Sequence, residues 1–238
     1  EVAEVCIAGG RATGVVLADG VEIGAGIVVS NADPKRTYLK LVPASALDPE
    51  FTAAVRGIKM DGPCGKFNLV LSEEPRLANE EPGSDALRRA QFTLVPWLDG
   101  AQAAYGEARR GRIAEELWID CLVPSLVDDS LATPGRHVMT CFVQYLPYAL
   151  SGSDWSLERE RLEAQLLRQI ARFVPAAGRS VVAQRLYTPA DLESTFGITE
   201  GNIFHGDLRP DQLFFMRPVP GHARYAAPVP ALYLCGAG

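Results

Sequence analysis

The chain has 238 residues, a formal net charge of -6, 47% hydrophobic residues and 22% charged residues. This composition is typical of a packed globular protein and argues against disorder. The acidic balance also argues against a nucleic-acid surface, because such a surface needs clustered Lys and Arg, and the one dense basic run, residues 109–112, is short.

The five cysteines are scattered, without a paired C-x-x-C spacing. This pattern argues against a zinc site or a disulfide framework and favours a reducing compartment such as the cytoplasm. No apolar run reaches the roughly 18 residues that span a bilayer, and no signal peptide is recognisable. Peripheral contact with a membrane and the oligomeric state are left open.

The N-terminal part of the chain predicts strands followed by a helix. Short β-favouring runs separated by Gly-Gly and Asp-Gly predict a three-stranded antiparallel meander over residues 5–23. The fully apolar run 27–29 is typical of a strand buried in a parallel sheet. A short helix is predicted over residues 34–41, with Asp33 or Asn31 as its N-cap.

The middle of the chain alternates strand-like and irregular runs. A helix is predicted over residues 49–56 and a strand over 66–71. Residues 72–111 are rich in Glu, Pro, Ala and Gly, so loops and short helices are expected there. The runs 116–123 and 137–145 predict two strands joined by a long hairpin connection.

Residues 153–173 form the clearest helical pattern. Apolar side chains recur at spacings of four, four and three residues, at Leu162, Leu166, Ile170 and Phe173. Residues 181–187 predict a further strand, and the run that starts at Thr188 predicts a short capped helix.

Two local motifs suggest other functions, and neither is complete. Residues 205–212 echo the catalytic loop of aminoglycoside-phosphotransferase-like kinases, but Gln212 stands where a metal-binding Asn is needed, and no acidic residue follows Asp211. Residues 24–29 begin like a dinucleotide fingerprint, yet they precede a strand and open no helix. A G-x-S-x-G elbow for Ser/His/Asp catalysis is also missing from the sequence.

A set of segments, in a fixed order, carries a family resemblance. They are residues 14–34, 124–137, 188–189, 201–206, 211–218 and 232–236. In this order and spacing they resemble the phytoene-desaturase-like FAD-dependent oxidoreductases, and they are most similar to the branch that contains pyridine nucleotide-disulfide oxidoreductase domain proteins.

The resemblance implies an α+β fold with a mixed, mostly antiparallel sheet flanked by helices as the substrate-binding domain. Residues 1–33 would be a remnant of a Rossmann-like FAD-binding domain, 34–231 the substrate-binding domain, and 232–238 a strand that returns to the FAD domain. The chain begins without Met inside a predicted strand and stops after an apolar strand and a Gly-rich turn. We therefore expect it to be cut from a longer protein.

The resemblance also implies site residues. The cofactor-binding positions would be Val5, Asn31, Ala32, Cys235, Gly236 and Ala237. His205 would be the catalytic candidate, because imidazole titrates near neutrality and could transfer a proton near the flavin, although a His before Gly is often a turn or packing residue. Gln212 and Arg217 would orient substrate or flavin, or else Arg217 would anchor two segments through hydrogen bonds. No metal site is expected.

The implied function is hydride transfer between FAD and a hydrophobic, polyene- or isoprenoid-like small molecule, by an enzyme of which this fragment is inactive alone. Two alternatives stay open, a flavin amine oxidase and a non-catalytic binding domain of the same fold.

Overall fold

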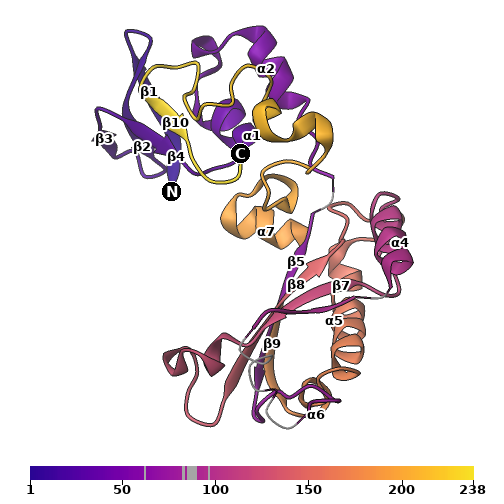
Figure 1. Cartoon of the computed structure of the whole chain (residues 1–238). Coiled ribbons are helices and arrows are strands. Elements are labelled where there is room, and N and C mark those ends of the chain that lie inside the picture. The colour runs from indigo at the N-terminus through magenta and orange to yellow at the C-terminus, as the bar shows by residue number, and fades with distance from the viewer. Residues whose placement is uncertain (62, 82–83, 85–89, 96) are drawn as a thin grey trace. The chain divides into compact units, whose positions relative to one another are not determined.

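The structure is a computed structural model that describes residues 1–61, 63–81, 84, 90–95 and 97–238 (Figure 1). The chain forms two compact units. Unit 1 comprises Glu1–Asp61 and Glu193–Gly238, and unit 2 comprises Gly62–Leu192. Residues 34–61 and 193–231 thus pack with the terminal strands, whereas the sequence placed the boundaries at Pro34 and Ala231. The assignment of a cofactor domain and a substrate domain stays a prediction.

Unit 1 begins with the expected meander. Strands β1 (Val2–Ala8), β2 (Arg11–Leu17) and β3 (Glu22–Gly24) form an antiparallel sheet in the order β1-β2-β3. A Cβ atom on Gly14 would lie 2.2 Å from the Ile23 carbonyl oxygen, so only glycine allows β2 and β3 to pair this closely. The predicted meander is confirmed.

A two-stranded parallel sheet pairs a strand of the N-terminal segment of unit 1 with a strand of its C-terminal segment. Strand β4 (Val28–Ser30) pairs with β10 (Leu232–Leu234), with Val28 opposite Leu232. The predicted parallel strand is confirmed, but its expected burial holds only for Val28, since Val29 is 59% exposed. β10 is the only strand that pairs with β4 among the described residues, which leaves the second edge of β4 unpaired there.

Two capped helices complete the core of unit 1. Helix α1 (Pro34–Arg36) continues as a π-helical turn, Thr37–Leu41, and α2 (Pro49–Arg56) follows. Asp33 caps α1 and Asp48 caps α2 through side-chain bonds to backbone N–H groups. The buried core of this unit includes Val5, Tyr38, Leu41, Phe51, Val55, Val219, Leu232 and Leu234.

Unit 2 is built on an antiparallel sheet in the order β6-β7-β8-β5-β9. Its strands are β5 (Gly65–Leu71), β6 (Phe92–Leu94), β7 (Trp118–Leu122), β8 (His137–Gln144) and β9 (Val181–Tyr187). Four of them were predicted. The short β6 was missed, because it lies in the stretch for which loops and helices were expected.

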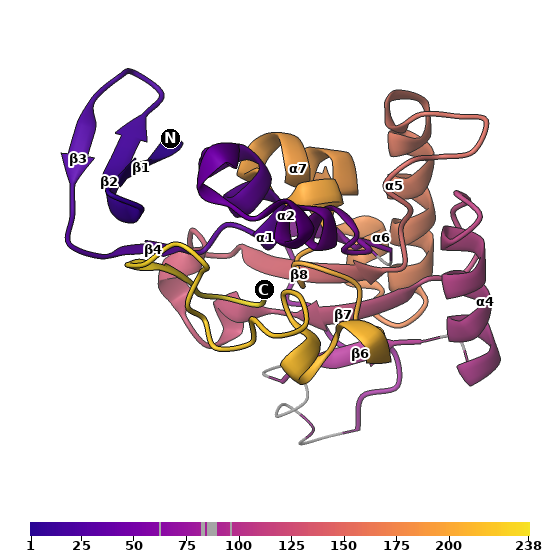
Figure 2. The same ribbon diagram turned by 90° about the horizontal axis from the view of Figure 1, so that it is seen from above.

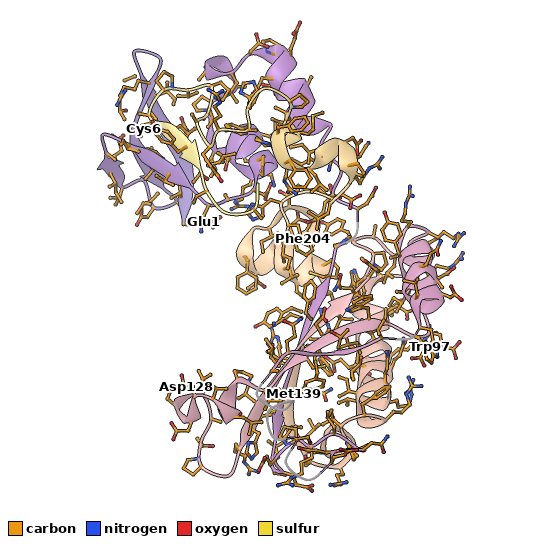
Figure 3. The ribbon with its side chains drawn as sticks, viewed as in Figure 1. Glu1, Cys6, Trp97, Asp128, Met139 and Phe204 are labelled. Atoms are coloured by element: carbon orange, nitrogen blue, oxygen red, sulfur yellow. The ribbon has the colours of Figure 1, made fainter. Side chains whose placement is uncertain are left out.

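Helices cover one face of this sheet. Helices α4 (Leu98–Ala108) and α5 (Trp155–Ala171) lie on the same side of the strands in both views, and α6 (Ala176–Arg179) follows α5 (Figures 1 and 2). Alternate residues of β8 are buried, and Met139, which is labelled in Figure 3, belongs to the same core as Leu162 and Leu166 of α5. Helix α7 (Pro189–Phe196) then crosses the boundary between the units.

The predicted helix over residues 153–173 is confirmed, and α5 itself covers Trp155–Ala171. Leu162, Leu166 and Ile170 are buried, whereas Phe173 lies beyond the helix end and is 43% exposed. Asp154 caps the helix by accepting from the Ser156 N–H. The predicted chain breaks at Pro82, Gly83 and Pro96 lie outside the described residues. The fold is therefore mixed α and β with antiparallel sheets, as the expected α+β class requires.

Candidate functional site

The site in unit 1 lies where β4 and β10 end. Because the two strands run parallel, their carboxyl ends lie at the same end of the pair, followed by Asn31–Ala32 and by Cys235–Gly236. The Cys235 N–H donates to the Ser30 carbonyl oxygen at 2.8 Å, and this bond holds the segments that follow the two strands side by side. In open α/β sheets, ligands bind outside the carboxyl ends of parallel strands.

The turn after β10 packs tightly against the rest of the site. Gly236 has φ +88°, and a Cβ atom there would lie 3.4 Å from the Cε1 atom of His205. A Cβ atom on Gly238 would lie 2.7 Å from the Cδ atom of Pro34, which begins α1. The Gly-Ala-Gly turn thus brings its backbone within reach of His205 and of the residues after β4.

His205 is held in an unusual environment. It adopts a left-handed backbone conformation with φ +59°, and its backbone N–H donates to the Asn202 carbonyl oxygen at 3.0 Å. Its Nδ1 atom is buried and has no hydrogen-bond partner among the described residues. Burial lowers the pKa of His205 below its ordinary value, while the charge of Asp33 acts in the opposite direction and that of Arg217 in the same direction.

The loop that carries His205 is anchored by Asn202. This side chain is 1% exposed, and its Nδ2 atom donates to the carbonyl oxygens of Met60 and Asp61, each at 3.2 Å. Its Oδ1 atom accepts from the Phe204 N–H at 3.0 Å. Sequence reasoning missed this anchor, although Asn202 lies in one of the segments that carry the family resemblance.

Asp33 provides a second anchor that sequence reasoning recognised only as a cap. Besides accepting from the Arg36 N–H at 3.0 Å, its carboxylate accepts from the N–H of Thr199 at 3.0 Å. The Thr199 hydroxyl group donates to the same carboxylate. A single buried side chain therefore links the start of α1 to the segment that leads into the His205 loop.

Gln212 and Arg217 both bind the backbone of unit 1. The Gln212 side chain accepts from the Lys59 N–H at 2.7 Å and donates to the Lys59 carbonyl oxygen at 3.1 Å. Arg217 donates to the carbonyl oxygen of Phe204, and burial lowers the pKa of the guanidinium group. These contacts favour the anchoring interpretation of Arg217 and suggest the same for Gln212, and contact of either residue with substrate stays a prediction.

The remaining predicted positions border a cleft of about 500 Å³ in unit 1. Val5, Asn31 and Ala32 line it together with β4 and the C-terminal end of α7. Val5 is 2% exposed, and its contact with a cofactor stays a prediction. The site thus brings together His205, Asn31 and the Gly-rich turn, while Val5 lies on the cleft.

A larger cleft, of about 770 Å³, lies wholly in unit 2 between α5 and residues 111–116. Its arginines are largely neutralised by neighbouring carboxylates, as in the pairs Arg161–Glu158 and Arg172–Glu116. We therefore assign it no anion-binding role. The described part of the chain contains no cluster of His, Cys, Asp and Glu that could hold a metal ion.

Comparison with known proteins gave matches over nearly the whole chain. No family model matches. Pyridine nucleotide-disulfide oxidoreductase domain-containing protein 2 of Mus musculus is 36% identical over 236 residues, which cover 96% of this chain and 41% of that protein. A lycopene-forming phytoene desaturase of a Paracoccus strain is 26% identical and matches 100% of this chain and 45% of its own length. The chain spans about two fifths of the length of these curated relatives.

A solved structure shares the fold. The crystal structure of an oxidoreductase from Methanosarcina mazei matches 100% of this chain and 43% of its own, with a TM-score of 0.50 and 18% sequence identity. Among the described residues, no helix has both the length and the apolar character needed to cross a membrane.

Proposed function

We propose that this chain is the C-terminal part of an FAD-dependent oxidoreductase that acts on a hydrophobic substrate. The proposal is supported by the homology of the chain, over most of its length, to phytoene desaturases and to a pyridine nucleotide-disulfide oxidoreductase domain protein. One observation of the structure carries the cofactor assignment. The Gly236–Gly238 turn packs against His205 and Pro34 at the shared carboxyl end of two parallel strands.

The residues of this turn support the binding of a cofactor. A Cβ atom on Gly236 or Gly238 would meet His205 or Pro34, so glycine lets the turn pack against these two residues. Glycine also allows a ligand to approach the backbone closely. The buried Nδ1 atom of His205, which has no partner among the described residues, can take part in a hydrogen bond with such a ligand. Asn31 and Ala32 border the same region from β4.

FAD would supply the hydride chemistry, and this chain would supply binding and orientation. His205 is the residue to which we assign proton transfer near the flavin, because burial keeps its imidazole neutral and able to accept a proton. Gln212 and Arg217 would hold the His205 loop in position through their backbone contacts. The name of the phytoene desaturases supports a hydrophobic substrate.

The proposal is tested by the flavin content of two purified proteins. The first is the 238-residue chain, and the second is the same chain extended at both ends to the full length of its relatives. We expect the extended protein to purify yellow, with about one FAD per chain, and the 238-residue chain to bind little. Near-unit flavin in the short chain would show that it lacks no essential part of the FAD site.

A pair of glycine variants tests the site itself in the extended protein. We expect Gly236→Ala to lower the FAD content, because the new Cβ would meet His205 at a position with φ +88°. Gly26→Ala is the matched control, since a Cβ at Gly26 has no neighbour within 4 Å. Equal FAD content in the two variants would remove the Gly-rich turn from the cofactor site.

The two alternative functions predict different results for the flavin of the extended protein. A non-catalytic binding domain predicts an extended protein that folds without flavin. A flavin amine oxidase predicts that amines, rather than polyenes or other apolar compounds, bleach the flavin spectrum under anaerobic conditions. We expect bleaching by apolar compounds.

A further inference from the structure

Two cysteines face each other inside unit 2. Cys121 on β7 lies directly opposite Cys141 on β8 in the antiparallel register. Their sulfur atoms are 3.7 Å apart, with the Cys121 thiol donating to the Cys141 sulfur. Both residues are 0% exposed and belong to the core between the sheet and α5.

The backbone at this pair already suits a covalent link. Residues opposite each other in antiparallel strands have Cα atoms about 4.5–5.5 Å apart. Disulfides join residues whose Cα atoms are about 4.4–6.8 Å apart. Closing the sulfur–sulfur gap therefore requires rotation of the side chains and no new arrangement of β7 and β8.

We propose that Cys121 and Cys141 form an intramolecular disulfide when the chain meets a disulfide oxidant such as oxidised glutathione. One cysteine attacks the glutathione disulfide as a thiolate, which forms a mixed disulfide and releases one glutathione. The second cysteine then displaces the other glutathione and closes the protein disulfide. The two protein thiols lose two electrons and two protons, and one glutathione disulfide becomes two glutathione thiols.

The environment of the pair sets the speed of this reaction. The hydrogen bond with Cys141 and the burial of the group raise the pKa of the Cys121 thiol well above its ordinary value. Because the thiolate is the reactive form, oxidation of the folded protein is slow and follows opening of β7 from β8. The reaction is fast when the chain refolds, since both sulfur atoms are then exposed before they are buried.

The test uses the whole chain, refolded from urea in a buffer of reduced and oxidised glutathione. We expect two of the five thiols to become linked, so that titration of the denatured product finds three. Peptide mapping without reductant should recover one linked pair that contains Cys121 and Cys141. The oxidised protein should also unfold at a higher urea concentration than the reduced protein, because the link restricts the unfolded chain.

Three variants make the result specific. Cys121→Ala and Cys141→Ala should each keep four free thiols, whereas Cys6→Ala, in unit 1, should still form the link. The proposal is overturned if the two cysteines remain reduced after refolding. It is equally overturned if they end as separate glutathione adducts, or if the links recovered involve Cys6, Cys64 or Cys235 instead.

Discussion

His205 combines an unusual backbone conformation with a buried, titratable side chain. Its ring packs against the turn after β10, its backbone has φ +59°, and its Nδ1 atom is buried. Two charged groups act on it in opposite directions, because Asp33 favours the imidazolium form and Arg217 disfavours it. Burial is the largest influence, so the neutral form is the one that the folded chain stabilises.

This environment predicts how stability depends on pH. Since the pKa of His205 is lower in the folded chain than in the unfolded chain, the unfolded chain binds more protons below about pH 6.5. The contribution of His205 is complete above that pH and is lost as the pH falls through its folded pKa. We expect His205→Asn, which tolerates a positive φ, to flatten the decline in stability between about pH 7 and pH 5.

Urea unfolding followed by circular dichroism across this pH range measures the difference between the wild type and His205→Asn. His137, whose pKa is also lowered by burial, is present in both proteins and cancels in that difference. Parallel pH profiles for the two proteins would contradict the assigned environment of His205.

Some of the site could be predicted from the family resemblance of the sequence. His205, Asn31 and Gly236 lie in segments with the family pattern, the structure brings them together, and their roles stay predictions. The role of Asn202 could not be predicted, because its partners are 141 and 142 residues away in the sequence. A side chain that supports a loop through such distant contacts leaves no local pattern.

At the scale of elements, capping residues decide where the short helices of unit 1 begin. Asp33 and Asp48 each stand before a Pro at the first helical turn, and each accepts from backbone N–H groups of its helix. The two caps differ in one respect. Asp33 is 2% exposed and also binds Thr199, whereas the bonds that the Asp48 side chain makes with described residues stay within its own turn.

This difference gives a matched pair of substitutions. Asp48→Ala should lower the free energy of unfolding by about 0.5–2 kcal/mol, the usual cost of losing an N-cap. Asp33→Ala should cost more, because it also leaves the Thr199 N–H without its partner. Thermal unfolding of both variants measures the two costs, and equal values would show that the link to Thr199 adds no stability.

Sequence periodicity predicted the long elements well and the short ones poorly. Helix α5 was predicted because its apolar residues recur over 17 residues. Strand β6 has 3 residues and, among the described strands, pairs with β7 alone. Its β-favouring run is too short to stand out from the Gly and Pro residues around it. Neighbouring strands, rather than its own sequence, make it a strand.

At the scale of the whole molecule, each unit has its own hydrophobic core. Leu166 belongs to the core of unit 2, and Phe51 belongs to that of unit 1. The sequence placed the boundary at Pro34 because a turn follows the apolar strand there. It could not show that Phe51 and Val55 of α2 share a buried core with Val28 of that strand, since this packing depends on tertiary structure.

The two cores can be examined with different probes, because Trp97, Trp118 and Trp155 all lie in unit 2. We expect Leu166→Ala to lower stability by about 2–5 kcal/mol, and tryptophan fluorescence should report the loss. Phe51→Ala should cost about 3–5 kcal/mol and should appear in circular dichroism with little change in tryptophan fluorescence. Leu157→Ala, at a position 71% exposed on the same helix as Leu166, is the control. If both core variants shifted the two signals together, the units would unfold as one.

Side chains of helix α5 also bind the backbone of residues 114–117, in the way that a neighbouring strand usually does. The amide of Gln169 accepts from the Leu117 N–H at 3.1 Å and donates to the Leu117 carbonyl oxygen at 2.6 Å, and Gln165 donates to the carbonyl oxygens of Ala114 and Glu115. The alignment of residues 114–117 along the helix is thereby set residue by residue. We therefore expect natural variation in length to be excluded from residues 114–117, because an added or missing residue there would displace these pairings.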